Sequence, residues 1–171
     1  MKLSRLTRKL LTIGVLSSLM VMWGAEVALT QRPISVLDLS CVVTKEGYVF
    51  FKETKDISVA REIYTAFLGS RSDREMTCKL PPGATLLKLD YLMTDVDDPA
   101  PLKMTIWLDG NEQANFTAIP GKVGTMKPLD LTNRRSIAFA TSCARAANCY
   151  NSRLWFIKAQ IEFTPTSPGS R

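Results

Sequence analysis

The stretch that decides the fold is residues 102–119, LKMTIWLDGNEQANFTAI. Its first seven residues alternate between two faces, with Met104, Ile106 and Leu108 on one and Lys103, Thr105 and Trp107 on the other. Such alternation is typical of a strand with one buried face. Asp109-Gly110 is a favoured two-residue turn, after which residues 112–119 return. The stretch therefore predicts an antiparallel β-hairpin.

The same alternation continues on both sides of this hairpin. Upstream, Leu87, Leu89, Tyr91 and Met93 share one face of a predicted strand. Downstream, Trp155, Ile157, Ala159, Ile161 and Phe163 share one face of the last strand, residues 154–163. Short strands separated by turns about every ten residues are typical of β-sandwiches. We therefore predict an all-β fold, an antiparallel β-sandwich of the jelly-roll kind.

One segment departs from this pattern. Apolar residues between positions 57 and 68 have helical spacing, with Ser58 as an N-cap and Gly69 as a stop. The spacing predicts one short helix near residues 58–68. An extended segment that ends in a turn is the alternative.

The N-terminus is typical of an export signal. Four bases precede an uncharged apolar run at residues 10–23, which is shorter than the roughly 20 residues that span a bilayer. We expect a signal peptide over residues 1–28, or an uncleaved anchor, then a single domain over 29–163 and a disordered tail over 164–171. The predicted location is secreted or periplasmic, or tethered to the membrane if the signal is kept.

Charge and composition restrict the function. The chain contains no histidine, which excludes Ser/His/Asp and Cys/His catalytic pairs and histidine-ligated metals. Removing residues 1–28 takes away four bases and one acid, so that the formal charge falls from +6 to +3. This weakens the case for nucleic-acid binding. We predict a protein that is not an enzyme and that uses no cofactor.

The four cysteines all follow the signal. In an oxidising compartment an even number indicates disulfides. Of the three possible pairings, proximity favours Cys143 with Cys149, which leaves Cys41 with Cys78. A zinc site is the competing interpretation, but the chain has neither a CxxC pair nor a histidine.

Two groups of residues are candidates for binding. Trp107 lies on the polar face of its predicted strand with Lys103 and Thr105, where it would offer a stacking platform for a sugar ring. The alternative is that a neighbouring element covers the ring. Asp95, Asp97 and Asp98, with Asp90, form a weak calcium candidate. A solvated acidic turn is the competing interpretation of that group.

The order of motifs resembles a known family. Residues 104–110, 129–132, 135–139 and 154–163 are similar to the second half of galactose-binding-like jelly-roll domains. They resemble the carbohydrate-binding modules associated with NPCBM-type glycosidases, over roughly residues 64–163. The resemblance implies a jelly-roll fold and sugar binding. In one departure, the loop at 143–153 contains two cysteines but lacks the aspartate that often orders the site in that family.

These observations favour an exported binding module whose ligand is a glycan or a protein of the cell envelope. The alternative is a structural or accessory subunit that docks into a larger membrane or envelope assembly. A small hydrolase that works without histidine is a third possibility.

Overall fold

The computed structural model describes residues 31–45, 47–96, 99–145 and 149–163 as twelve β-strands and one short 3-10 helix. The elements in chain order are β1 (Ile34–Ser35), η1 (Val36–Asp38), β2 (Ser40–Lys45), β3 (Phe50–Val59), β4 (Glu62–Arg71), β5 (Arg74–Lys79), β6 (Ala84–Met93), β7 (Leu102–Leu108), β8 (Asn111–Ala118), β9 (Lys122–Thr125), β10 (Leu129–Asp130), β11 (Ser136–Cys143) and β12 (Arg153–Phe163). The predicted all-β class is confirmed.

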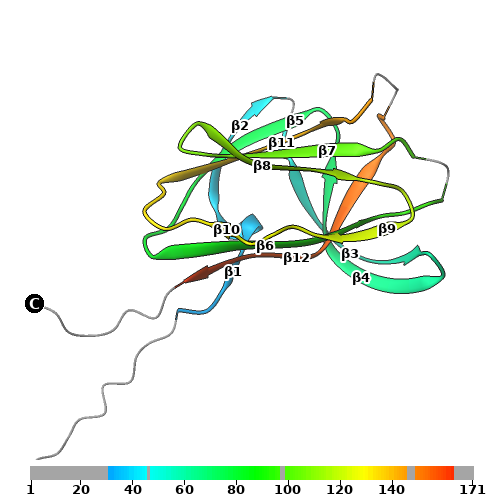
Figure 1. The fold of residues 1–171 in the computed structure, drawn as a ribbon, viewed down its shortest axis with the longest axis horizontal. Helices are drawn as coiled ribbons and strands as arrows, with labels where there is room; N and C mark the ends of the chain where they lie inside the picture. The colour runs from blue at the N-terminus through cyan, green and yellow to red at the C-terminus, as the bar shows by residue number, and fades with distance from the viewer. Residues whose placement is uncertain (1–30, 46, 97–98, 146–148, 164–171) are drawn as a thin grey trace, which may run out of the picture.

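The strands form two antiparallel sheets that face each other (Figure 1). The larger sheet has seven strands in the order β10-β6-β12-β4-β3, and in addition β1 pairs with β12 and β9 pairs with β6. The smaller sheet has five strands in the order β2-β5-β11-β7-β8. Consecutive strands alternate irregularly between the sheets, as in a jelly roll, and the predicted β-sandwich is therefore confirmed.

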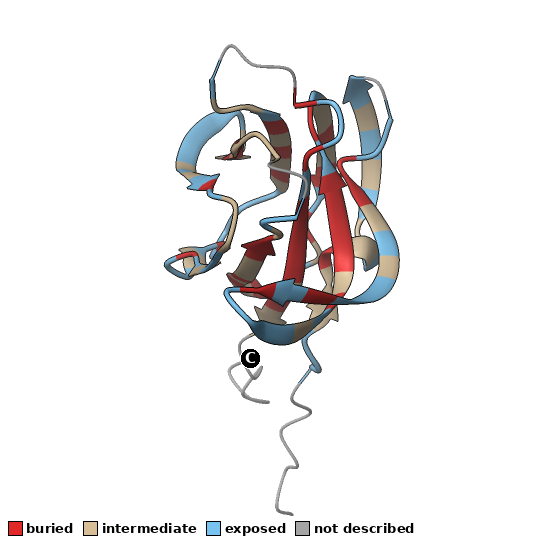
Figure 2. Ribbon diagram, turned by 90° about the vertical axis from the view of Figure 1, so that its right-hand side faces the viewer, coloured by how far each residue is buried: buried red, intermediate tan, exposed pale blue. Residues whose placement is uncertain are grey.

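The main core fills the space between the sheets, where buried residues of both inner faces meet (Figure 2). Met104, Ile106 and Leu108 lie in it, as the alternation of β7 predicted. Phe50 of the larger sheet contacts Phe139 of the smaller one, with ring centroids 5.0 Å apart, and Phe156 at 5.4 Å. Edge-to-face contacts of this kind stabilise a core beyond the area they bury.

The predicted helix at residues 58–68 is wrong, because this segment is the end of β3, the turn that follows it and most of β4. The chain reverses at Ala60 and Arg61, both of which have positive φ, and Ile57 then pairs with Tyr64. The β-branched and aromatic residues of β4 favour a strand, and the strand gains backbone hydrogen bonds from β3 and β12. The hairpin curls away from the sandwich (Figure 1) and encloses a second, smaller core that includes Leu92 and Trp155.

The prediction for the last strand is wrong in one respect. A β-bulge lies between Phe156 and Lys158, and it shifts the alternation by one residue. Trp155 is buried as expected, but it packs in the second core, whereas Ala159 and Ile161 face the main core. Phe156, which the simple alternation placed on the polar face, is fully buried in the main core.

The Asp109-Gly110 turn is confirmed, since both residues have the positive φ that a tight hairpin turn requires. The carboxylate of Asp109 also holds the neighbouring strand. It accepts hydrogen bonds from the backbone N–H groups of Arg135 at 3.1 Å and Ser136 at 3.0 Å. These donors, the Arg135 N–H first, hold the pKa of Asp109 below its usual value.

The lowered pKa predicts how stability depends on pH. Because the folded protein favours the charged form, the stabilisation is present above the ordinary aspartate pKa of about 3.9 and is lost as the pH falls through the lower folded value. We expect Asp109→Asn, which keeps the turn conformation, to lower the Tm at neutral pH, with a smaller difference at about pH 3. Thermal melts at both pH values measure this, and an equal difference at the two would contradict it.

The ends of the chain fall outside this description. The predicted signal over residues 1–28 and the predicted tail over 164–171 lie outside the described residues. In the described part of the chain, no helix is long and apolar enough to span a membrane.

Candidate functional site

The residues predicted to bind a sugar lie on the outer face of the smaller sheet. Trp107 is half-buried, with Ala138 of β11 and Glu112 of β8 directly opposite it in the neighbouring strands. Thr105 is only 8% exposed, whereas Lys103 is half-buried. The structure therefore brings the three side chains onto one face but leaves the hydroxyl-bearing residue little contact with solvent.

The two predicted disulfides are both present. Cys41 and Cys78 are directly opposite each other on β2 and β5, and their bond links these two neighbouring strands of the smaller sheet. Cys143 and Cys149 close the loop before β12.

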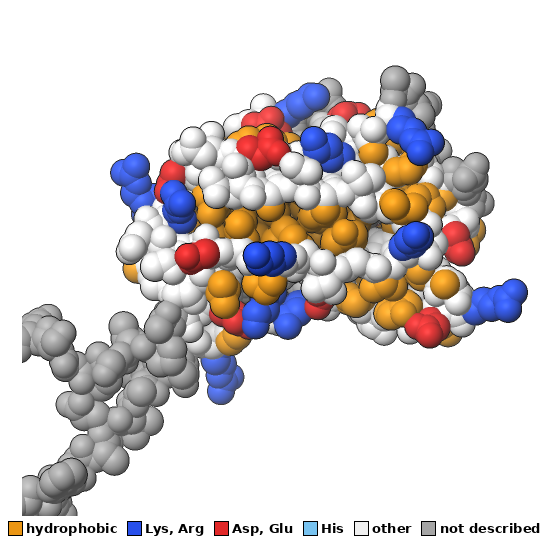
Figure 3. Space-filling view, viewed as in Figure 1, with side chains coloured by type: hydrophobic (Ala, Val, Ile, Leu, Met, Phe, Trp, Pro, Cys, Tyr) orange, Lys and Arg blue, Asp and Glu red, His pale blue; other side chains and the backbone are white. Residues whose placement is uncertain are grey.

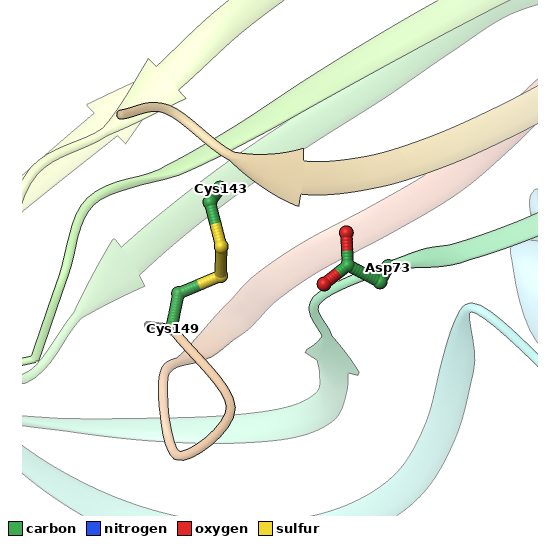
Figure 4. Close-up of side chains that lie close together, drawn as sticks. All are labelled: Asp73, Cys143 and Cys149. Carbon is green, nitrogen blue, oxygen red and sulfur yellow. A yellow bond between two sulfur atoms is a disulfide. The ribbon is translucent and has the colours of Figure 1, made fainter. Parts of the chain in front are cut away.

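The predicted calcium group is only partly described. Asp95 is exposed and Asp90 lies within β6, while Asp97 and Asp98 lie outside the described residues. Among the described residues, one group of three side chains with metal-ligating atoms lies together, namely Asp73, Cys143 and Cys149 (Figure 4). Because the two sulfurs are bonded to each other, this group offers one carboxylate and no thiolate.

A groove that the sequence did not indicate lies between the two sheets. Its volume is about 730 Å³, and it is open to solvent along one side of the sandwich. One wall is β8, from Glu112 to Phe116, and the other is the segment from Thr125 to Leu129 that connects β9 with β10. In Figure 3 the apolar side chains in the middle of this face gather between these two walls. We refer to this hollow as the aromatic groove.

Two stacked rings line the aromatic groove. Tyr91 of β6 and Phe116 of β8 are nearly parallel, with centroids 4.1 Å apart and an interplanar angle of 17°. The pair joins the two sheets at their open side, and both side chains are half-buried. Burial raises the pKa of the Tyr91 hydroxyl, so that the group stays protonated and can donate a hydrogen bond at neutral pH.

A glycine makes room for this arrangement. Gly124 is directly opposite Tyr91 in the β6–β9 pair. A Cβ atom at Gly124 would lie 2.5 Å from Cζ of Tyr91 and 2.7 Å from its hydroxyl oxygen. The absence of a side chain there lets the tyrosine ring lie across β9, and the ring in turn covers the glycine backbone.

Hydrogen-bonding groups border the apolar floor. On the β8 wall the amide of Asn115 donates to a carboxylate oxygen of Glu112 at 2.7 Å, next to the exposed Gln113. The opposite wall contributes the exposed Lys127. An apolar floor with amide, carboxylate and ammonium groups at its margin can hold a ring that has one apolar face and a polar edge.

The aromatic groove and the Trp107 face adjoin at β8. Glu112 and Asn115 line the groove, and they are also the partners directly opposite Trp107 and Thr105. β8 is an edge strand of its sheet and lies next to β7, which carries Trp107 and Thr105. The two candidate surfaces are therefore separated by a single strand.

Comparison with solved structures places the fold among carbohydrate-binding modules. A structure of the CBM51-2 and INT domains of Clostridium perfringens ZmpB, in complex with GlcNAc, matches 78% of this chain with a TM-score of 0.63 and 15% identity. This chain spans 32% of the length of that structure. The CBM51 module of Clostridium perfringens GH95, in complex with methyl-galactose, matches 76% of this chain and 99% of its own length, with a TM-score of 0.63 and 8% identity.

A third match is the pair of tandem CBM51 modules of a family 98 glycoside hydrolase from Streptococcus pneumoniae SP3-BS71. It covers 77% of this chain and 47% of that structure, with a TM-score of 0.60 and 10% identity. No family model and no curated protein sequence matches the chain. The resemblance predicted from the motifs is confirmed at the level of the fold, which does not by itself determine function.

Proposed function

We propose that the protein is a non-catalytic module that binds a neutral sugar ring in the aromatic groove. The observation that carries this proposal is the stacked pair of Tyr91 and Phe116 on the floor of an open groove with polar margins. The fold shared with CBM51 modules that are seen with GlcNAc and with methyl-galactose supports the assignment of a sugar as ligand. The two disulfides support an extracellular or periplasmic location.

The non-enzymatic role rests on what the groove contains. Glu112 is its one carboxylate among the described residues, and the Asn115 amide already donates to it. Glycoside hydrolysis ordinarily requires two carboxyl groups that flank the scissile bond. A groove with one acid and an aromatic floor is suited to holding a sugar rather than cleaving it.

The outer face with Trp107, Lys103 and Thr105 is the second proposed contact surface. Because β8 alone separates it from the aromatic groove, an oligosaccharide that binds one surface can extend to the other. The two surfaces differ in how accessible their polar groups are, since Thr105 is nearly buried whereas the margin of the groove is exposed. We therefore place the main contribution to affinity in the groove.

A binding experiment with one phenylalanine variant and one tryptophan variant tests this assignment. A glycan array identifies the ligand of the wild-type protein, and isothermal titration then compares Phe116→Ala with Trp107→Ala. We expect Phe116→Ala to cost about 2 kcal/mol, or about thirtyfold in Kd, because it removes half of the stacked pair. Trp107→Ala should cost less than about fivefold.

Folding controls accompany the affinities. Phe163→Ala is a matched control, because Phe163 is also half-buried at the margin of the main core but lies outside the groove. Gln113→Ala and Lys127→Ala test the exposed margin without touching the core. If no glycan binds while the protein co-purifies with a membrane assembly, the accessory-subunit alternative replaces this proposal. Equal losses in Phe163→Ala and Phe116→Ala would show that the groove is not the site.

A further inference from the structure

Two arginines face each other on the outer surface of the larger sheet. Arg71 ends β4 and Arg153 begins β12, and the two residues are directly opposite in the antiparallel pair. Like charges in such cross-strand positions destabilise a sheet. Among the described residues the ion pairs are Lys88–Glu162 and Arg134–Asp109, so that neither Arg71 nor Arg153 has a carboxylate partner there.

The aromatic ring of Phe51 holds both guanidinium groups. Their central carbon atoms lie 5.2 Å (Arg71) and 5.9 Å (Arg153) from the centroid of the ring. The ring itself lies against Gly69, where a Cβ atom would be 2.3 Å from it. Phe51 also contacts the buried Trp155 edge-on, with ring centroids 5.7 Å apart. The two guanidinium groups therefore lie against an aromatic ring that its neighbours hold in place.

A network of buried hydroxyl groups fixes the backbone beneath the arginines. Four of the five buried polar residues of the described chain lie within this corner, namely Ser70, Ser72, Thr141 and Ser152. Thr141 donates to the carbonyl of Arg71, and Ser72 donates to the carbonyl of Cys149 at 3.2 Å. The Ser152 N–H donates to the same Cys149 carbonyl at 2.9 Å. Together with the Cys143–Cys149 disulfide, these bonds preorganise the segments that carry the arginines.

The arginines line a small hollow. Its volume is about 200 Å³, and it is lined by Arg71, Ser72, Asp73, Arg74, Tyr150, Asn151 and Arg153. Its one carboxylate among the described residues is that of Asp73, which lies beside the disulfide (Figure 4). A second hollow of about 500 Å³ shares Asn151 and Arg153 with the first and is also lined by Lys55. The ammonium nitrogen of Lys55 lies 5.8 Å from the centroid of the Trp155 ring. The two hollows together are bordered by four cations.

We propose that this corner is a second binding site, which takes a carboxylate or sulfate group of an acidic polysaccharide. Three arginines, whose guanidinium groups offer forked N–H donors, line a hollow that is large enough for a single anionic group. The adjoining hollow, with Lys55 and Trp155, gives the rest of the polymer a continuous path. An anion between Arg71 and Arg153 relieves the repulsion between them. That the anion is carried by a glycan rests on the proposed function.

The test compares acidic and neutral ligands of equal length. Isothermal titration measures wild-type protein with a sulfated oligosaccharide, an oligouronate and an uncharged oligoglucoside. We expect at least one acidic ligand to bind more tightly than the uncharged one. We expect its affinity to fall as NaCl rises from about 50 mM to about 300 mM, because salt screens exposed charges.

Variants then locate the site. We expect Arg71→Gln and Arg153→Gln each to weaken binding of the acidic ligand by about tenfold. Each variant should change the Tm little, since the like-charge repulsion that it removes offsets the cation–π contact with Phe51 that it loses. The matched control is the double variant Lys79→Gln and Lys122→Gln, which removes two exposed charges outside the hollows and should leave binding within about twofold.

The outcomes separate this inference from the proposed function. Binding of the uncharged ligand with no preference for either acidic one overturns the anion site but leaves the aromatic groove intact. Equal weakening by the lysine control also overturns it, because the effect then comes from net charge. Polyglutamate that binds as tightly as the acidic glycans overturns the assignment of a polysaccharide.

Discussion

Phe139→Ala is expected to lower the free energy of unfolding by about 4 kcal/mol. Phe139 of β11 is fully buried and contacts Phe50 of the opposite sheet, so that the ring joins the two layers at the centre of the main core. Its removal leaves a cavity that β11 cannot move to fill, since β5 and β7 hold this strand on its two sides. Because small domains are stable by only about 5–15 kcal/mol, this is a large fraction of the total.

Urea unfolding measures the effect, with Phe67→Ala as the control. Phe67 is half-buried and packs against the margin of the same core. Its truncation should cost clearly less than that of Phe139, since solvent or neighbouring side chains can replace part of the lost contact. Similar losses for both variants would contradict the position of Phe139 at the centre of the interface between the sheets.

Removal of the Cys41–Cys78 disulfide is expected to destabilise the protein by about 4 kcal/mol. The bond closes a loop with a sequence separation of 37, and most of its effect comes from restricting the unfolded chain. The Cys143–Cys149 bond spans a separation of 6 and should contribute about 2 kcal/mol on the same basis. The ratio of the two expected destabilisations follows from the lengths of the two loops, so that each disulfide serves as a control for the other.

The measurement uses two double variants, Cys41→Ala with Cys78→Ala and Cys143→Ala with Cys149→Ala. Urea midpoints should shift more for the first pair than for the second. The intact mass of the wild-type protein after alkylation should show no modified thiol, because all four cysteines are paired. The reverse order of the two shifts would contradict the account, as would free thiols in the wild-type protein.

Several elements of the fold follow from local patterns. The alternation of residues 102–108 correctly identified Met104, Ile106 and Leu108 as core, because one face of β7 meets the opposite sheet over its whole length. Asp109-Gly110 correctly indicated the turn, since positive φ restricts the choice of residue. The cysteine pairing also followed from spacing alone.

The predictions from the sequence fail where tertiary contacts determine the secondary structure or the face on which a side chain lies. The helical spacing of residues 57–68 combines apolar residues from the end of β3 with those of β4, which the turn at Ala60 and Arg61 separates. A spacing that runs across a turn does not reflect one regular element, and the pairing of β4 with β3 and β12 decides the conformation. At Phe156 a single extra residue in a bulge reverses the predicted face, and no local signal in the sequence marks that position.

The candidate site was the part least accessible from the sequence. Tyr91 was assigned to a buried face, and its stacking partner Phe116 lies 25 residues further along the chain in the other sheet. Only the way the two sheets meet brings the rings together. One signal was present in Gly124, because a glycine within a strand often marks the close approach of another group. The arginine corner likewise depends on the pairing of β4 with β12.

The most direct test of the glycan-binding account is an NMR titration of uniformly labelled protein with the oligosaccharide that the array identifies. We expect the largest backbone and aromatic shift changes at Tyr91, Phe116, Gln113 and Lys127, with saturation and with only minor changes at Ala138 next to Trp107. Failure of every glycan to bind would contradict the account. Shift changes confined to the surface around Trp107, or to residues far from the open side of the sandwich, would also contradict the account.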